Sequence, residues 1–331
     1  MPNRVTIADV ARLAGVSTMT VSRVINAKAD VSPSTKARVE RAIAQLEYRP
    51  SQAARTLTTR RSHTLGLLVP DITNPFFPEI VRGAEDVAWE HGYMVSLANT
   101  VEDSERERAA LEHFEDHRVD GLLICSARLP ESALSAILRR HQAVVLLNRR
   151  VADERVASLE VDDAHGTRAA MAHLIAGGRR CIGLLAGPAR SASSTKRRAG
   201  YREGLEAAGL RFDPTLVQDG EPSEAGGHAA LVALLERRSD VDAVVCYNDV
   251  VAIGALAALA ELGRSVPEHV AVVGCDDVRL ASLVTPALTT LHIDTYALGR
   301  QAALLLFERM REEPPRHVTL QPELVVRASA P

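Results

Sequence analysis

Cysteine is scarce in this chain of 331 residues, which has only four. Cys125, Cys181, Cys246 and Cys275 lie far apart, each beside an apolar run, and no two have the C-x-x-C spacing of a redox or zinc motif. The spacing therefore argues against a disulfide or zinc framework and predicts four buried thiols.

Long apolar segments are also missing. No run reaches 18 consecutive apolar residues, and the first residues lead into no stretch of signal-peptide length. These absences predict a cytoplasmic protein that has no membrane partner. With 46% hydrophobic residues the chain can still build a large core, and its length suggests two or three domains.

The glycine signatures of nucleotide binding and hydrolysis are absent. No two of the 20 glycines stand two positions apart, which excludes G-x-G-x-x-G, and neither G-x-x-x-x-G-K-[ST] nor G-x-S-x-G occurs. His113 and His117 stand four apart, but HExxH is absent and a solvated helix face is the favoured interpretation. The sequence thus predicts no enzyme, no cofactor and no metal site.

Two pairs of adjacent aspartates are the remaining candidates for acid–base chemistry. They are Asp162-Asp163 and Asp276-Asp277. Adjacent residues on a strand point to opposite faces of the sheet, so the two carboxyl groups within each pair are not expected to share a proton.

Charge is distributed unevenly along the chain. Residues 1–61 carry 11 basic and 4 acidic side chains, whereas residues 62–331 carry 28 and 38, so a head of charge +7 precedes a body of charge −10. A basic head suits a polyanion, and nucleic acid is the first candidate.

The head has the helical periodicity of a helix-turn-helix. Apolar spacing predicts helices over Ile7–Leu13 and about Pro33–Leu46, with a turn at Ala14-Gly15-Val16. Between them Ser17 is expected to cap a second helix by accepting from the backbone N–H of Thr20. The second helix of such a motif enters the major groove of DNA. A small helical core without DNA binding is the alternative.

Three side chains of the second helix are expected to point outward and read bases: Thr18, Met19 and Arg23. The Arg23 guanidinium matches guanine O6 and N7. Small polar side chains nearby suit phosphate contacts, and these are Thr6, Thr20, Ser22 and Asn26.

After residue 62 the pattern becomes strand–helix–strand. Apolar runs that alternate with amphipathic helices lie at 65–69, 93–97, 122–125, 144–147, 182–186, 243–246 and 270–274. So many units predict two doubly wound α/β lobes, divided near 157–162, with ligand chemistry at the carboxyl ends of the strands.

Several motifs in the sequence also resemble those of a known protein family. V-T-I-A-D-V-A at 5–11 and A-G-V-S-T-M-T-V-S-R-V-I-N at 14–26 closely resemble the DNA-binding signature of the LacI/GalR family of bacterial transcription regulators. Further motifs in family order are Tyr48-Arg49-Pro50, Ala53–Leu57, Asp71–Phe77, Val119–Leu122, Ala199-Gly200-Tyr201, Asn248-Asp249 and Thr289-Thr290.

The resemblance implies an N-terminal three-helix helix-turn-helix head and a two-lobed body like that of periplasmic binding proteins. The implied limits are 1–48 for the head, 49–61 for a hinge and 62–331 for the effector-binding and dimerisation domain. Within that domain, the first lobe is expected at about 62–159 plus 292–320 and the second at about 160–291 plus 321–331.

The segment Ser51–Thr59 is too short to persist as an isolated helix. The resemblance implies that it is a hinge helix that folds on DNA and inserts Leu57 into the minor groove, where an apolar wedge kinks the duplex. A basic interdomain linker is the alternative. The DNA contacts expected from the resemblance also include Ser17, Ser32, Thr35, Ala54 and Arg55.

For the first lobe the resemblance implies effector contacts by Phe76, Phe77, Ser126 and Asn148, with Arg149 beside them. The two rings could wall a pocket, and the hydroxyl and amide groups suit a polar ligand. Core packing and turn capping are the alternative roles.

For the second lobe it implies Arg197, Asn248 and Asp276, while Asp249 is expected to cap the helix at 250–262. The loop at 219–224 lacks the aromatic residue found in many relatives, and Glu221 there suggests a polar or cationic group on the ligand.

The sequence therefore predicts a repressor that binds a palindromic operator as a homodimer and responds to a small polar effector such as a sugar. It would be cytoplasmic, and associated with the nucleoid when bound to its operator. A stand-alone solute-binding protein and an enzyme on a similar fold are the alternatives.

Overall fold

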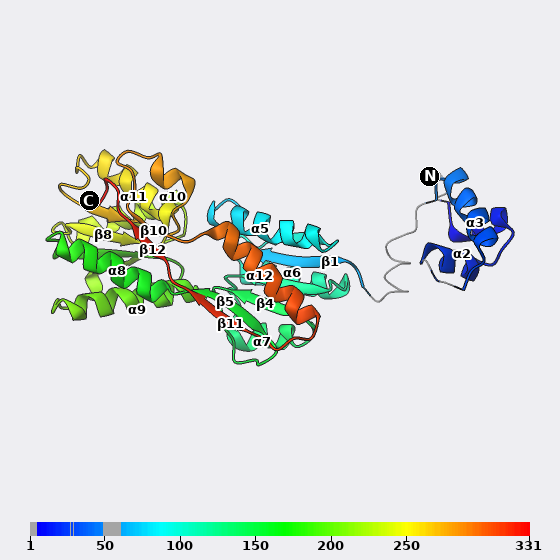
Figure 1. Ribbon diagram of the computed structural model, residues 1–331. Helices are drawn as coiled ribbons and strands as arrows, with labels where there is room; N and C mark the ends of the chain where they lie inside the picture. The colour runs from blue at the N-terminus through cyan, green and yellow to red at the C-terminus, as the bar shows by residue number, and fades with distance from the viewer. Residues whose placement is uncertain (1–4, 27, 29, 49–60) are drawn as a thin grey trace. The chain divides into compact units, whose positions relative to one another are not determined.

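The computed structural model describes residues 5–26, 28, 30–48 and 61–331 (Figure 1). The contacts divide the chain into two units, Met1–Ser62 and His63–Pro331. The predicted hinge contacts Ala54, Arg55 and Leu57 lie outside the described residues.

The head consists of helices α1 (Ile7–Ala14), α2 (Thr18–Ile25) and α3 (Pro33–Gln45). Gly15 ends α1 in the left-handed conformation at φ 62°, which a residue without Cβ adopts at no steric cost. Val10, Val21 and Val39 are fully buried and join the three helices in one small core.

The first lobe of the body is built on a parallel sheet. Its strands in spatial order are β11 (His317–Leu320), β5 (Ala157–Val161), β4 (Val144–Leu147), β3 (Gly121–Cys125), β1 (Thr64–Val69) and β2 (Met94–Asn99). Helices α5 (Phe76–Glu90) and α12 (Thr295–Met310) pack on one face, and α6 (Ser104–Asp116) and α7 (Glu131–Leu138) pack on the other.

The second lobe repeats this plan with four parallel strands, in the order β7 (Val217–Asp219), β6 (Ile182–Ala186), β8 (Ala243–Cys246) and β9 (Ala271–Val273). Its covering helices are α8 (Asp163–Ala176), α9 (Ala192–Ala207), α10 (Glu224–Arg237) and α11 (Asp249–Glu261). Short 3₁₀ turns occupy Pro214–Leu216 and Arg279–Ser282, and β10 (Thr290–His292) pairs with β12 (Glu323–Val325) in an antiparallel ribbon.

Parallel strands place all their carboxyl ends at one edge of the sheet, where loops can form a binding site. The chain passes between the lobes after β5, between β10 and α12, and between β11 and β12. Both sheets therefore direct their functional edges toward the region that these crossings span.

The predicted α/β class and the two lobes are confirmed, and each predicted apolar run overlaps a strand. Cysteine burial is confirmed for Cys125, Cys246 and Cys275 but is wrong for Cys181, which is only partly buried and donates its thiol hydrogen to Asp240. None of the helices in the described part of the chain combines the length and apolar character needed to cross a membrane.

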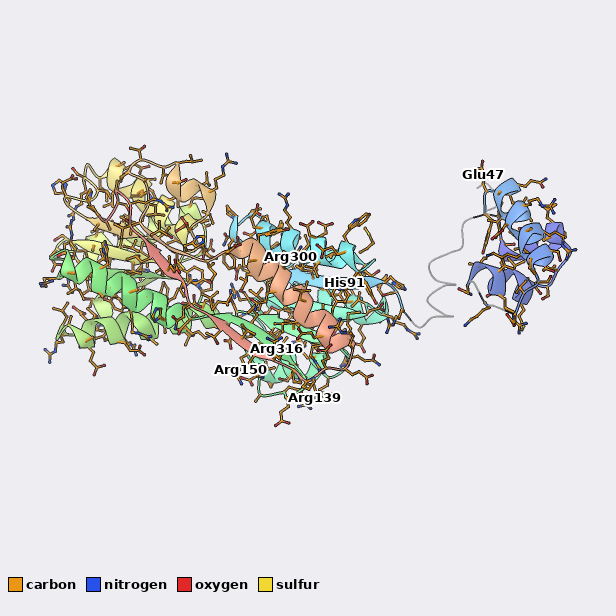
Figure 2. All side chains as sticks on the ribbon, in the orientation of Figure 1. Glu47, His91, Arg139, Arg150, Arg300 and Arg316 are labelled. Atoms are coloured by element: carbon orange, nitrogen blue, oxygen red, sulfur yellow. The ribbon has the colours of Figure 1, made fainter. Side chains whose placement is uncertain are left out.

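Glycine lets helices α5 and α12 approach closely. A Cβ at Gly83 would lie 2.2 Å from the backbone oxygen of Tyr296, and one at Gly299 would lie 2.1 Å from that of Ile80. Side-chain contacts add to it: the His91 ring stacks on Phe307, and Arg300 donates to Glu90 at 3.0 Å. His91 and Arg300 are labelled in Figure 2.

We predict that Gly83→Ala destabilises the protein by about 1–3 kcal/mol, because the added methyl group would overlap a backbone oxygen that cannot rotate away. Gly177→Ala is the matched control, since a Cβ there meets its nearest atom at 3.4 Å. Calorimetric unfolding of both variants tests this, and equal melting temperatures would contradict the close-packing account.

Candidate functional site

The outer face of α2 is exposed, as its periodicity predicted. Met19 is 64% exposed, and Thr18 and Arg23 lie on the surface with it. An apolar side chain this exposed at the start of a helix does not contribute to the head's core. Base contact by these three residues stays a prediction.

The small polar side chains of the head cap its helices. Thr6 and Asp9 form a capping box on α1, Ser17 accepts from Thr20 N–H at 3.1 Å, and Ser32 accepts from Thr35 N–H at 3.3 Å. Ser17 thus caps α2 as predicted. Thr20, Ser22, Asn26 and Thr35 are half-buried, and phosphate contact by any of these side chains stays a prediction.

Arg23 forms an ion pair with Asp30 at 3.2 Å, and about half of each side chain is exposed. Exposed pairs of this kind contribute only about 0–1 kcal/mol. The guanidinium can therefore leave Asp30 at little cost when a better acceptor is present.

In the body, the carboxyl ends of strands from both lobes surround a cavity. Seven of the nine predicted effector residues line it: Phe76, Phe77, Ser126, Asn148, Arg197, Asn248 and Asp276.

A buried ion cluster occupies the second-lobe side of this cavity. The Arg197 Nη2 atom lies 2.8 Å from Asp163 Oδ1 and 3.8 Å from Asp276 Oδ1, and the guanidinium covers the Tyr247 ring at 4.8 Å. Asp163 is 2% exposed and Asp276 is 7% exposed. Burial acts to lower the pKa of Arg197, but Asp163, with smaller contributions from Cys275, Asp276 and Tyr247, outweighs burial and raises that pKa, so the cation is held firmly.

Asp276 has the most strongly perturbed carboxyl group of the lining. Burial raises its pKa to about 7, and Asp163 adds to this, while Arg197 acts in the opposite direction. Its backbone is strained at φ 111°, a left-handed value that few non-glycine residues adopt. Strain and an altered pKa at the same residue are typical of functional positions.

The predicted cap of α11 is wrong. Asn248, not Asp249, caps this helix by accepting from Val251 N–H at 2.9 Å. Asp249 is fully buried and accepts from Val278 N–H and Thr290 Oγ1, at 2.8 and 2.5 Å. The sequence did not reveal these partners because they lie 29 and 41 positions away.

Two first-lobe residues of the cavity occupy turns directly after strands. Ser126 and Asn148 have φ values of 49° and 56°. The Asn148 side chain accepts from Val161 N–H at 3.1 Å, so this residue also joins β4 to β5. Such turns place polar groups at the sheet edge, where they line the cavity.

Arg149 and Glu221, the other two predicted contacts, do not line this cavity. Arg149 donates to the backbone oxygen of Leu129 at 3.3 Å, and Glu221 is exposed in a wider hollow that shares Glu102 and Pro222 with the cavity. Both residues lie in loops, where the apolar periodicity of the sequence does not predict the direction of a side chain.

The sequence analysis did not assign six further lining residues: Asn74, Glu102, Arg128, Ser193, Pro222 and Tyr247. A positional signal was available for two of them. Glu102 and Arg128 each follow the end of a strand, β2 and β3, by three residues. The rule that sites form at carboxyl strand ends would have found this pair.

The other catalytic candidates are structural. Asp162 caps α8 and Asp163 faces Arg197, so this pair lies at a helix start and not on a strand as expected. Asp277 pairs with Arg327 at 2.7 Å and thus diverges from Asp276. Within the described residues no group of three or more His, Cys, Asp or Glu side chains is arranged to hold a metal, and the His113 ring lies against the His117 ring at an interplanar angle of 32°.

A helix-turn-helix head and a two-lobed ligand-binding body in one chain define a ligand-controlled DNA-binding regulator. Two family models match: "Bacterial regulatory proteins, lacI family" over residues 6–51 and "Periplasmic binding proteins and sugar binding domain of LacI family" over residues 62–328. The chain belongs to the LacI family of bacterial transcription regulators.

Individual relatives agree. The chain is 35% identical to the regulator GalR of Escherichia coli, and the match spans 98% of this chain and 95% of GalR. It is 39% identical to CelR of Thermobifida fusca, and that match spans 98% of both chains. The structure of the Lac repressor dimer bound to operator and the anti-inducer ONPF superposes with a TM-score of 0.84 at 29% identity, covering 99% of both chains. These relatives are transcriptional regulators, which confirms the prediction that the chain is not an enzyme.

We predict that Asp276→Asn removes a pH dependence of stability. The Asp276 carboxyl has a pKa near 3.8 when unfolded and about 7 when folded. Between these two pKa values only the folded state keeps the proton. The contribution of this group to the free energy of unfolding therefore falls as pH rises from about 4 to about 7, and it changes no further above pH 7. Melting temperatures at pH 5 and 7.5 should fall more in wild type than in Asp276→Asn, and an equal fall would contradict the buried, protonated carboxyl.

Proposed function

We propose that this protein is a repressor that binds a near-palindromic operator as a homodimer and changes its operator affinity when a small polar effector occupies the body's cavity. The observation that carries this proposal is the buried Arg197 cluster in a cavity that both lobes line, within a chain whose head exposes a recognition helix. We further propose a cytoplasmic location, on the nucleoid when the operator is bound.

The DNA-binding part of the proposal is supported by the exposed face of α2. Thr18 and Met19 begin the helix that a helix-turn-helix inserts into the major groove, and Arg23 lies one turn further along. The weak pair with Asp30 leaves the Arg23 fork available for guanine.

The effector part is supported by the chemistry of the lining. Amide, hydroxyl and guanidinium groups surround the edge-to-face rings of Phe76 and Phe77, a mixture that suits a ligand with polar edges and an apolar face. Related structures contain sugars: a CelR–cellobiose complex at 36% identity and an Enterococcus faecium LacI family regulator with ribose at 26% identity.

Dimerisation is supported by exposed apolar side chains on the first lobe. Trp89, Met94, Leu97 and Val101 are 73%, 56%, 43% and 52% exposed, at the end of α5 and along the edge strand β2. Exposed apolar side chains beside an open strand edge favour pairing with a second copy of the chain. The Lac repressor structure named above is a dimer on its operator.

Control of DNA binding then follows from linkage. An effector that binds one lobe arrangement better shifts the population toward it, and the joint at residues 49–61 transmits the change to the two heads. An effector that favours the operator-bound arrangement acts as a corepressor, and one that favours the other arrangement acts as an inducer. A solute-binding protein without DNA contact is the second candidate, and it predicts no steep salt dependence of duplex binding.

We predict that Arg23→Ala weakens specific DNA binding by roughly 5- to 150-fold and removes selectivity at one base pair in each half-site. Arg41→Ala is the control, because Arg41 is also exposed and its loss removes the same charge from α3. Selection from a randomised duplex pool gives the consensus of each variant. An Arg23→Ala consensus identical to that of wild type would contradict base reading by Arg23.

We predict that Arg197→Gln keeps operator affinity but abolishes its response to effector, because the substitution removes the cation that Asp163 and Asp276 position. Arg198→Gln is the matched neighbour, since Arg198 pairs with Asp219 and does not line the cavity. Effectors are first identified by a thermal-shift screen of sugars, polyols and nucleosides. A normal response in Arg197→Gln would place the effector elsewhere.

A further inference from the structure

The turn after β9 connects the cavity to the segments that cross between the lobes. Asp276 lines the cavity, whereas the next residue, Asp277, does not. We propose that Asp277 is a positioning residue, which couples ligand binding in the cavity to the relative arrangement of the two lobes. This inference rests on the proposed function and names a residue through which its control of DNA binding passes.

The backbone of this turn runs beside the crossing segment that contains β10. Asp276 forms a parallel bridge to His292, and its backbone N–H donates to the Leu291 oxygen at 2.9 Å. A second parallel bridge joins Val273 to Thr289. Since β10 pairs in turn with β12, the cavity wall and two of the three crossings form one hydrogen-bonded unit.

The Asp277 side chain binds both of these crossing segments. Its Oδ1 atom lies 2.7 Å from Arg327 Nη2, and its Oδ2 atom lies 3.0 Å from His292 Nδ1. His292 ends β10, three residues before α12 begins, and Arg327 follows β12 by two residues. One carboxyl group therefore holds both crossings at a fixed distance from the cavity wall.

Arg327 is itself held on its other side. Its Nη1 atom donates to the Leu288 oxygen at 2.9 Å, and its backbone N–H donates to Thr289 Oγ1 at 2.8 Å. The side chains of Asp277 and Arg327 are only 15% and 21% exposed, so solvent screens this pair less than it screens the surface pairs. The link between the turn and the crossing is therefore stiff.

The remaining crossing, after β5, also leads to this turn. Asp163 follows β5 by two residues and pairs with Arg197, whose Nη2 atom lies 3.8 Å from Asp276 Oδ1. All three crossings thus lead to residues that are linked to Asp276 or Asp277.

Backbone strain at the turn makes it sensitive to its neighbours. Asp276 and Asp277 have φ values of 111° and 52°, two consecutive left-handed residues that are not glycine. Such a conformation persists only where surrounding contacts determine it. The two residues share one planar peptide unit, so a ligand that shifts Asp276 also shifts Asp277 and, through its side chain, both crossings.

The first experiment measures coupling in the full-length protein with the Asp277→Asn substitution. Asparagine has the same shape and tolerates left-handed φ, so the ion pair is lost while the turn is kept. The probes are cellobiose, ribose and every compound that stabilises wild type in the thermal-shift screen. We expect the affinity of the free protein for the active probe to stay within about threefold, because Asp277 does not line the cavity. The factor by which that probe changes operator affinity, typically about 5–150 in regulators, should fall toward one.

Two further variants separate coupling from a merely structural role. Asp213→Asn is the matched control, because Asp213 also pairs with an arginine, Arg238, but within the second lobe. It should keep the wild-type coupling factor. Arg327→Gln should lower that factor as Asp277→Asn does, and the double variant should lower it no further. A wild-type coupling factor in Asp277→Asn would overturn the proposal, and so would a loss of probe affinity as large as the loss of coupling.

The second experiment needs neither ligand nor operator. Arg197→Gln disturbs the cavity cluster without removing a partner of Asp277. Amide hydrogen exchange in β10 and β12 should change roughly threefold or more when Arg197→Gln is made in wild type, and should not change when it is made in Asp277→Asn. An equal change in both backgrounds would overturn the inference.

The two experiments also distinguish this inference from the proposed function. If no probe alters operator binding by wild type, the effector-controlled function fails, while hydrogen exchange still decides the role of Asp277. If a probe alters operator binding equally in wild type and in Asp277→Asn, the inference fails and the repressor proposal stands.

Discussion

A buried guanidinium between carboxylates is the interaction on which the ligand-binding half of this molecule depends. Arg197 from α9 must meet Asp163 at the start of α8 and Asp276 after β9, because an unpaired charge in that position would be very costly. Removing one partner of a buried pair typically costs about 3–5 kcal/mol. The cluster therefore fixes the geometry of the second-lobe edge before any ligand arrives.

The first lobe also contains a buried guanidinium paired with a carboxylate, built from different residues. Arg128 is held by Glu102 and its loop by Glu107, so each lobe presents one immobilised guanidinium to the shared cavity. The turns that carry Ser126, Asn148 and Asp276 have positive φ, and this strain is concentrated at the carboxyl ends of the strands. The described strands of the parallel sheets contain no residue with positive φ. Their well-packed cores offset the cost of the strained turns. Fold and site are thus separable: apolar runs build the sheets, and strained polar turns at one edge build the cavity.

Sequence reasoning predicted the fold well because buried parallel strands are near-continuous apolar runs. It did not anticipate β5 or β11, nor the three-residue strands β7, β10 and β12, which leave no periodic signal. In the cavity it identified Arg197 and Asp276 through resemblance, but not the Arg128–Glu102 pair, whose partners are 26 positions apart. It assigned the helix cap to Asp249 instead of Asn248 because it lacked the long-range bond to Thr290. Side-chain direction in loops and contacts between distant segments are the information that one sequence does not contain.

The central claim is that the cavity and the operator are two sites coupled through one equilibrium between lobe arrangements. Coupling of this kind is reciprocal, so the factor by which effector changes operator affinity must equal the factor by which operator changes effector affinity. The most direct test is to titrate the effector into the free protein and into the operator complex. The account predicts two dissociation constants whose ratio equals the measured change in operator affinity. Equal effector affinity in the two states would contradict it.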